Sequence, residues 1–187
     1  MDKEYFKITL VRSTLKYGIV VAILLFSSCL APKKGSSNSA PKLFETFYVG
    51  DEGTQYFIKP LIFKDLSKNR LTLDITFRYK DKIKDTAIVN ISLLNSEKIK
   101  SIDSLKISND SVSLVFKDFK FLFAERLKND FNSRFSSNGQ LEGIFKLFNQ
   151  NNWLLTVYTQ NSVSTYNPHK DTKKKITKLQ YSVFSTF

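Results

Sequence analysis

Carboxylates are the side chains of this chain most able to perform acid–base chemistry. Hydrolysis of a glycosidic bond needs two of them about 5–10 Å apart across a cleft. The chain has 17 Asp and Glu residues, and their spacing selects no pair. The candidates are Asp51, Glu52, Asp74, Glu125 and Glu142. Asp74 lies between Arg70 and Arg78 on an alternating segment, a pattern typical of surface charge pairing.

Other kinds of catalysis are limited by a single histidine, His169, and a single cysteine, Cys29. Because a transition-metal site gathers several His, Cys or carboxylate ligands, these two residues predict no metal centre. Gly-x-Ser-x-Gly elbows and glycine-rich phosphate loops are absent from the sequence. Asp51-Glu52-Gly53 is more typical of a plain turn than of a calcium loop. We therefore predict no metal, no catalytic residues and a protein that is not an enzyme.

A basic segment near the C-terminus is the best candidate for an interaction patch. We expect residues 162–175 to form an exposed polar loop that could face an anionic partner, although a merely solvated loop has the same composition. The patch residues are Tyr166, His169, Lys170, Lys173, Lys174 and Lys175. A second hypothesis is an aromatic platform for a sugar or a protein, and core packing is its alternative. Its members would be Trp153, Tyr158, Tyr166 and Tyr181.

Residues 1–28 have the order of an export signal. Basic residues come first, and the apolar run Ile19–Phe26 follows. Its eight residues are too few for a bilayer-spanning helix, which needs about 20, but they suit a signal-peptide core of about 7–15. Cys29 follows two serines and has no second cysteine to pair with. An unpaired thiol in an exported protein requires an explanation.

The segment Phe26-Ser27-Ser28-Cys29 resembles the lipobox of bacterial lipoproteins, with Phe26 where an aliphatic residue is usual. The resemblance implies a diacylglycerol on the Cys29 thiol, cleavage before Cys29 and an N-acyl chain on the new amino terminus. With Leu30 next in the sequence, it also implies an anchor in the outer membrane and leaves open which face carries the domain. Plain secretion and an uncut N-terminal anchor are the alternatives.

After the signal, residues 29–41 predict a lipidated, Ser- and Pro-rich flexible tether, and residues 42–187 a single globular domain. The formal net charge of +12 favours anionic neighbours such as lipid head groups, glycans or an acidic protein. Nucleic acid would also suit this charge, but an exported protein rarely meets it.

Strict alternation from Arg70 to Tyr79 predicts a strand with one buried and one wet face. A charged turn at 80–85 and a returning strand at 86–94 follow. Pro60 places the predicted strand at 56–63 on an edge or at a bulge. Further strands are predicted at 99–107, 111–116, 153–159 and 176–184, and residues 141–148 fit either a strand or a helix.

Phe123, Leu127 and Phe131 recur every four residues and predict one amphipathic helix over 123–135. The fold class is therefore mainly β, a β-rich α+β domain. We expect a single antiparallel sandwich or curled sheet of about seven strands with one helix, connected as a meander.

Three functions fit these features. The first is a lipid-anchored, non-catalytic cell-envelope protein that binds or assembles with another envelope component. The second is a periplasmic immunity or inhibitor lipoprotein that neutralises a toxin or lytic enzyme. The third is a carboxylate-dependent hydrolase of envelope glycan.

Overall fold

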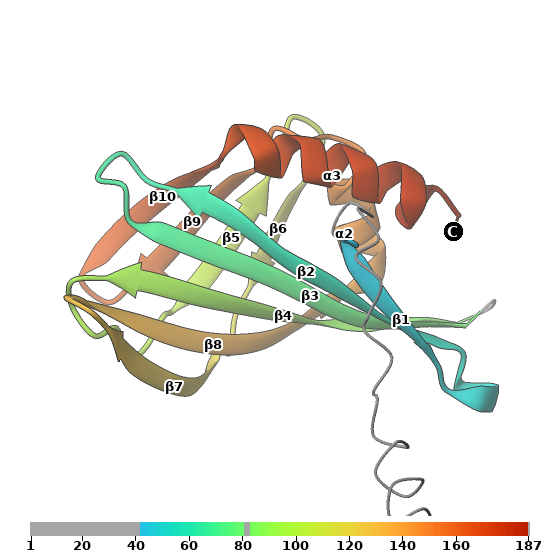
Figure 1. Ribbon diagram of the computed structural model, residues 1–187, viewed down its shortest axis with the longest axis horizontal. Helices are drawn as coiled ribbons and strands as arrows, with labels where there is room; N and C mark the ends of the chain where they lie inside the picture. Colours follow the sequence, from blue (N-terminus) through green and yellow to red (C-terminus); the bar gives the residue numbers. More distant parts are fainter. Residues whose placement is uncertain (1–41, 81–82, 187) are drawn as a thin grey trace, which may run out of the picture. The chain divides into compact units, whose positions relative to one another are not determined.

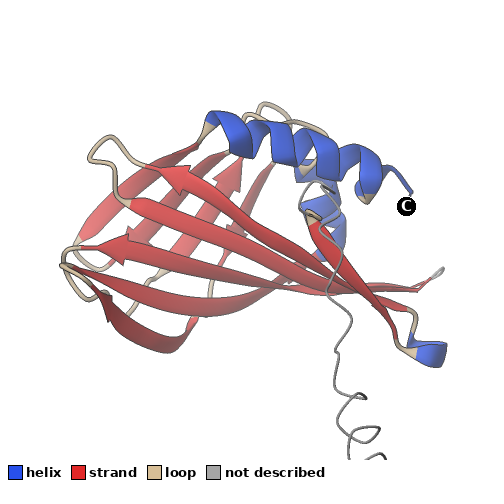
Figure 2. Cartoon of the chain, in the orientation of Figure 1, coloured by secondary structure: helices blue, strands red, loops and turns tan. Residues whose placement is uncertain are grey.

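The computed structural model describes residues 42–80 and 83–186, with backbone alone for 83–85. The predicted signal, the tether and Cys29 lie outside the described residues. Ten antiparallel strands form one sheet that curls into a half-barrel, with two helices against it (Figures 1 and 2). The strands are β1 (Phe44–Tyr48), β2 (Thr54–Lys64), β3 (Arg70–Lys80), β4 (Ile83–Asn95), β5 (Ser104–Ser108), β6 (Ser113–Phe116), β7 (Lys120–Leu127), β8 (Asp130–Gln140), β9 (Leu154–Thr159) and β10 (Ser162–Pro168). The helices are α2 (Leu141–Leu147) and α3 (Lys170–Ser182), with 3₁₀ turns η2 (Gly50–Glu52) and η3 (Phe184–Thr186).

The predicted fold class is confirmed, and the sheet is curled rather than a sandwich. β2, β3 and β4 are its long central strands, and β3 alternates as the sequence predicts. Leu71, Leu73, Ile75 and Phe77 are buried and the residues between them are partly exposed. This alternation places an apolar core on the concave face and a polar surface on the convex face.

The predicted meander is correct for β1 to β4 but not for the sheet as a whole. The full order is β6-β5-β9-β10-β2-β3-β4-β8-β7, with β1 also paired to β2. Three hairpins, β5–β6, β7–β8 and β9–β10, therefore join the sheet at places remote from their neighbours in the chain. Residues 117–119 alone connect β6 to β7, the two ends of this order. The sheet must curl for such a short connection to reach.

Pro60 lies at a bulge in β2, as its missing N–H predicts. The register with β3 shifts between Ile58 and Leu61, and both of these side chains point into the core. On the other edge of β2, β1 pairs with residues 54–58 and β10 with residues 63–64. Pro60 lies between these two ladders, where no strand requires its donor.

The predicted helix over 123–135 is wrong, because this region is the β7–β8 hairpin. A two-residue turn connects Leu127 to Asp130, with Lys128 at a φ of 59°. β7 is an edge strand whose apolar side chains remain exposed, and β8 points Ser133 and Ser137 into the core. Apolar residues outside and serines inside hide the period of two that a strand normally shows.

The loop predicted at 162–175 and the strand predicted at 176–184 are also wrong. Residues 162–168 form β10, and residues 170–182 form α3. Thr172, Ile176 and Leu179 give the helix a buried face with helical spacing. His169 caps its first turn by accepting the Asp171 N–H at 3.4 Å.

Aromatic rings fill the core between the sheet and the helices. Phe148 of the α2 C-terminus stacks on Phe184 at 3.8 Å and meets Trp153 edge-on at 4.7 Å, measured between ring centroids. Trp153 is 1% exposed, and its indole N–H donates to the carbonyls of Leu147 and Gln150. α2, η3 and the segment before β9 are therefore packed together around these rings.

Candidate functional site

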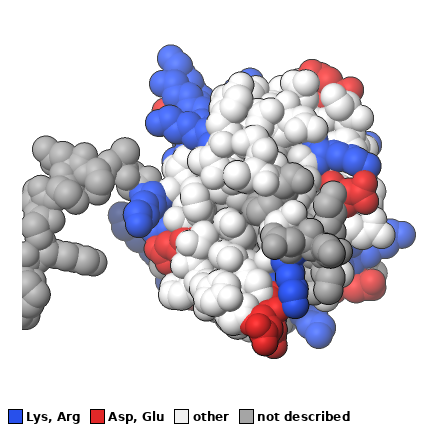
Figure 3. All heavy atoms as spheres, turned by 90° about the vertical axis from the view of Figure 1, so that its right-hand side faces the viewer, with Lys and Arg blue, Asp and Glu red and all other residues white. Residues whose placement is uncertain are grey.

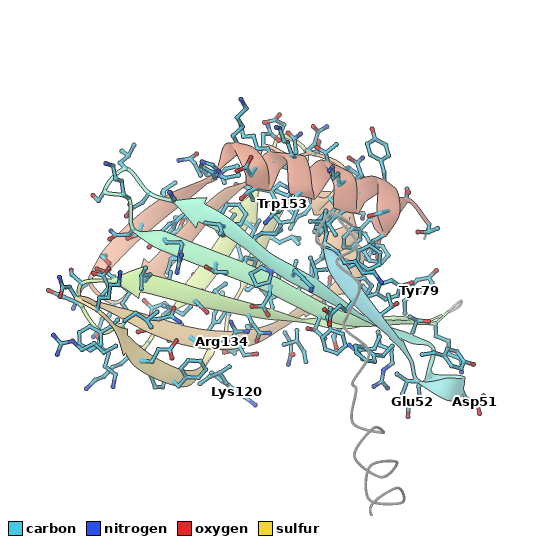
Figure 4. The ribbon with its side chains drawn as sticks, in the orientation of Figure 1. Asp51, Glu52, Tyr79, Lys120, Arg134 and Trp153 are labelled. Atoms are coloured by element: carbon cyan, nitrogen blue, oxygen red, sulfur yellow. The ribbon has the colours of Figure 1, made fainter. Side chains whose placement is uncertain are left out.

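A groove opens on the concave face where β1, β2 and β3 extend toward the end of α3. Its volume is about 770 Å³, within the usual range for ligand sites. The lining residues are Phe44, Thr46, Tyr48, Gly50, Asp51, Gly53, Thr54, Tyr56, Tyr79, Lys80, Ser182 and Thr186. Figure 4 shows Asp51 at the tip of the β1–β2 connection and Tyr79 beside the strands that lead to it.

The lining combines aromatic faces with hydroxyl groups. Four of its residues are aromatic, and seven carry a hydroxyl, counting the three tyrosines in both sets. Its charged side chains are one carboxylate, Asp51, and one ammonium, Lys80. Hydroxyls donate and accept hydrogen bonds, and aromatic faces pack on apolar surfaces of a ligand. This surface suits an uncharged ligand that has both polar groups and flat apolar faces.

The base of the groove is rigid because its aromatic residues continue into the core. Tyr56 stacks on Phe77 with the ring centroids 4.9 Å apart, and Phe77 contacts Phe184 at 5.7 Å. Burial raises the pKa of the Tyr56 phenol above its usual value, and the neighbouring Tyr79 raises it further. At neutral pH the Tyr56 hydroxyl therefore keeps its proton.

Gly53 sets the shape of the connection that closes this end of the groove. Its φ of 91° belongs to a region that residues with a Cβ rarely adopt. A Cβ on Gly53 would also lie 2.3 Å from the carbonyl oxygen of Tyr79. The turn from η2 into β2 can therefore lie against β3 only because residue 53 is glycine.

Charged groups near the groove lie mostly on its outer side. Glu52 pairs with the guanidinium of Arg78, which also donates to the amide oxygen of Gln55. Figure 3 looks toward this end of the domain. Where grey atoms do not cover the centre of this view, few charged side chains are visible, and most of them lie nearer the edge. The groove is thus less charged than the basic chain that carries it.

The candidate carboxylates do not meet in the groove. Among the described residues Asp51 is the single carboxylate of the lining, and Glu52 turns away to Arg78. Glu125 accepts from the Asn132 amide at 2.9 Å, and Glu142 pairs with Lys146 at 3.0 Å. Apart from the neighbours Asp51 and Glu52, the candidates lie on separate elements. The described part of the groove does not present the two facing carboxyls that glycoside hydrolysis needs.

Asp74 is paired on the convex face, but its partner differs from the expected ones. The pairing with Arg70 or Arg78 is wrong, because Arg134 of β8 reaches across β4 to Asp74 at 2.9 Å. Asn90 donates to the same carboxylate at 2.9 Å, and Ser92 accepts from the guanidinium at 2.9 Å. The network joins three strands, a structural role that suits a surface pair.

The structure divides the predicted interaction patch. Tyr166 is 3% exposed and belongs to the core, so it is not part of a surface patch. His169 and three of the lysines are exposed and Lys175 is partly exposed, all at the start of α3 rather than in a loop. The aromatic platform is not assembled either, because Trp153 is buried and Tyr181 is 72% exposed on α3.

The groove was missed by sequence reasoning although a weak signal exists. Phe44, Thr46 and Tyr48 occupy alternate positions of β1 and so share one face of the strand. Nothing local indicates that this face meets Ser182 and Thr186, which lie far along the chain.

The described residues contain no group of three or more potential ligands that could hold a metal ion. Within 42–80 and 83–186, no helix has the length and apolarity needed to cross a membrane. Comparison of the chain with family models, curated proteins and solved structures returned no match.

Proposed function

We propose that the chain is a lipid-anchored, non-catalytic protein of the cell envelope that binds another envelope component through the groove. In this proposal Cys29 carries the acyl chains, residues 29–41 form the tether, and the half-barrel presents the binding surface. We further propose the outer membrane as the site of the anchor.

The observation that carries the binding role is the groove itself. It is open, has a rigid aromatic base and is lined by hydroxyls with little charge. Such a lining favours recognition by hydrogen bonds and stacking. A sugar or a peptide segment of an envelope component offers both.

The two alternatives are distinguished by the partner and by the carboxylates. An immunity or inhibitor lipoprotein would use the same groove to hold a toxin or lytic enzyme, so the identity of the partner separates it from an assembly protein. A glycan hydrolase would need a second carboxylate opposite Asp51, and the groove lining offers none among the described residues.

The test is crosslinking and affinity isolation of the natively anchored protein, followed by mass spectrometry. Tyr48 is the residue to change, because it lines the groove and is 80% exposed, so the fold does not depend on it. Tyr48→Ala should lower recovery of the partner several-fold, with the protein itself at normal abundance.

Tyr181→Ala is the matched control. It removes the same side chain at similar exposure from a position outside the groove lining. Equal recovery from both variants and the unchanged protein would contradict binding through the groove. A toxin or lytic enzyme as the recovered partner would favour the inhibitor role.

A further inference from the structure

α3 carries a cluster of lysines that form no ion pair with the described residues. It carries five lysines, Lys170, Lys173, Lys174, Lys175 and Lys178, and one acid, Asp171. None of the five forms an ion pair with a described residue. Four of them are exposed and Lys175 is partly exposed. The helix therefore presents charge that contributes nothing visible to folding.

The orientation of this charge is fixed by the packing of the opposite side of the helix. Ile176 and Leu179 are fully buried. The Thr172 hydroxyl donates to the Ile62 carbonyl at 2.6 Å, which holds the first turn against β2. At 100° per residue, Lys170, Lys174 and Tyr181 lie on the side away from these contacts. The lysines thus point outward as one face.

The point where the tether would join the domain lies close to the other end of α3. Phe44 begins the first described strand and lines the groove together with Ser182 and Thr186, which follow the last lysine. In a chain anchored as proposed, a membrane surface would then be within reach of α3, because the proposed tether enters the domain beside the end of this helix. A helix of 13 residues is about 20 Å long and can lie along that surface.

We propose that the lysine face of α3, defined by Lys170, Lys173, Lys174 and Lys178, docks the domain on the anionic lipid head groups of the membrane to which the chain is anchored. This rests on the proposed function for the identity of the surface. The complementary charge is the phosphate of the lipid, and the attraction is electrostatic, because the four side chains that define the face are lysines. Docking would orient the groove relative to the membrane instead of leaving it on a freely rotating domain.

The experiment uses the full chain with Cys29→Ser, so that no acyl chain can hold it to lipid. Binding is measured by co-sedimentation with vesicles of phosphatidylcholine alone and of phosphatidylcholine mixed with phosphatidylglycerol. We expect binding to the anionic vesicles that falls as salt rises, because exposed charges are screened. Replacing Lys170, Lys174 and Lys178 together by Gln should weaken this salt-sensitive binding roughly a hundredfold, at about fivefold per lysine.

The control replaces Lys98, Lys100 and Lys120 by Gln, which lowers net charge equally on exposed positions away from α3. It should retain most of the binding. Equal losses in both triple variants would mean that net charge alone acts and would overturn the proposal, as would equal binding to both kinds of vesicle. Urea unfolding of each variant verifies that the fold is kept. If the vesicle experiment gives a negative result, the proposed lipid anchor on Cys29 is not affected. If Cys29 proves not to be lipidated, the vesicle result still stands, so the two proposals are tested separately.

Discussion

At the scale of single residues, Tyr166 shows what burial does to an ionisable group. Its phenol is 3% exposed in the core beneath β10. Burial raises the pKa of Tyr166 above its usual value, and the negative charge of Asp65 raises it further, while a hydrogen bond with Ser164 acts in the opposite direction. The folded protein thus holds this proton more tightly than the unfolded chain does.

The free energy of unfolding should consequently fall as pH rises above about 10, where the phenol of the unfolded chain ionises. Below that pH both states are protonated and the contribution is fully present. Tyr166→Phe cannot ionise, so its stability should decline less steeply over the same range. Urea unfolding at a series of pH values between about 8 and 11 provides the measurement. Tyr56, whose pKa burial also raises, keeps a decline of the same sign in the variant. Parallel curves for the two proteins would contradict the prediction.

At the scale of elements, the attachment of α3 to β2 depends on one hydroxyl. Thr172 is 3% exposed and donates to the carbonyl of Ile62, just after the Pro60 bulge. The same carbonyl receives a longer bond, 3.5 Å, from the His169 N–H. The bulge thus provides the acceptor that positions the start of the helix.

Thr172→Val keeps the shape of the side chain and removes the donor. It should lower the free energy of unfolding by about 1–2 kcal/mol, because the carbonyl loses its shorter partner inside the protein. Amide exchange in the first turn of α3 should become faster than in the sheet. Thr165→Val, an exposed threonine on β10, serves as the control and should stay within about 0.5 kcal/mol of the unchanged protein. A result for Thr172→Val no larger than this control would contradict the role of the hydroxyl.

The elements that the sequence predicted correctly are those whose buried and exposed residues alternate regularly or that contain a proline. β3 alternates between buried and partly exposed residues from Arg70 to Arg78, and Pro60 lies at the bulge in β2. β7 and β8 could not be found in this way, because the free edge leaves Phe121, Leu122 and Phe123 exposed. The segment with the lysines at the start of α3 was predicted to be a solvated loop, since its exposed charged residues have the composition of one. The groove could not be predicted from the sequence, because most of its lining residues come from the two ends of the domain sequence, Phe44 to Tyr56 and Ser182 to Thr186.

At the scale of the whole molecule, the proposed lipid anchor and the proposed lysine face would act on the same membrane. Two acyl chains hold a protein stably where one chain holds it only marginally, and surface lysines add a salt-sensitive contribution. Fractionation should therefore be carried out at low and at high salt, because only the contribution of the lysine face is screened by salt.

Cys29→Ser should move the protein from the membrane pellet to the soluble fraction after a high-salt wash, because both the proposed anchor and the electrostatic contact are then removed. Labelling cells with a radioactive fatty acid should mark the unchanged protein and leave the Ser variant unlabelled. The unchanged protein carried through the same wash is the control. A Ser variant that stays in the salt-washed pellet would show that the anchor is not the Cys29 lipid.

The order of strands has a consequence for how the protein is made. β2 lies between β3, which follows it directly, and β10, and the Thr172 contact to Ile62 spans 110 residues. As the nascent chain emerges, β2, β3 and β4 appear long before the strand and helix that cover them. Pairing over such separations is slow, since a long loop must close before any contact forms. During that interval α3 does not yet cover the apolar face of these strands, so folding can finish only after α3 has been synthesised.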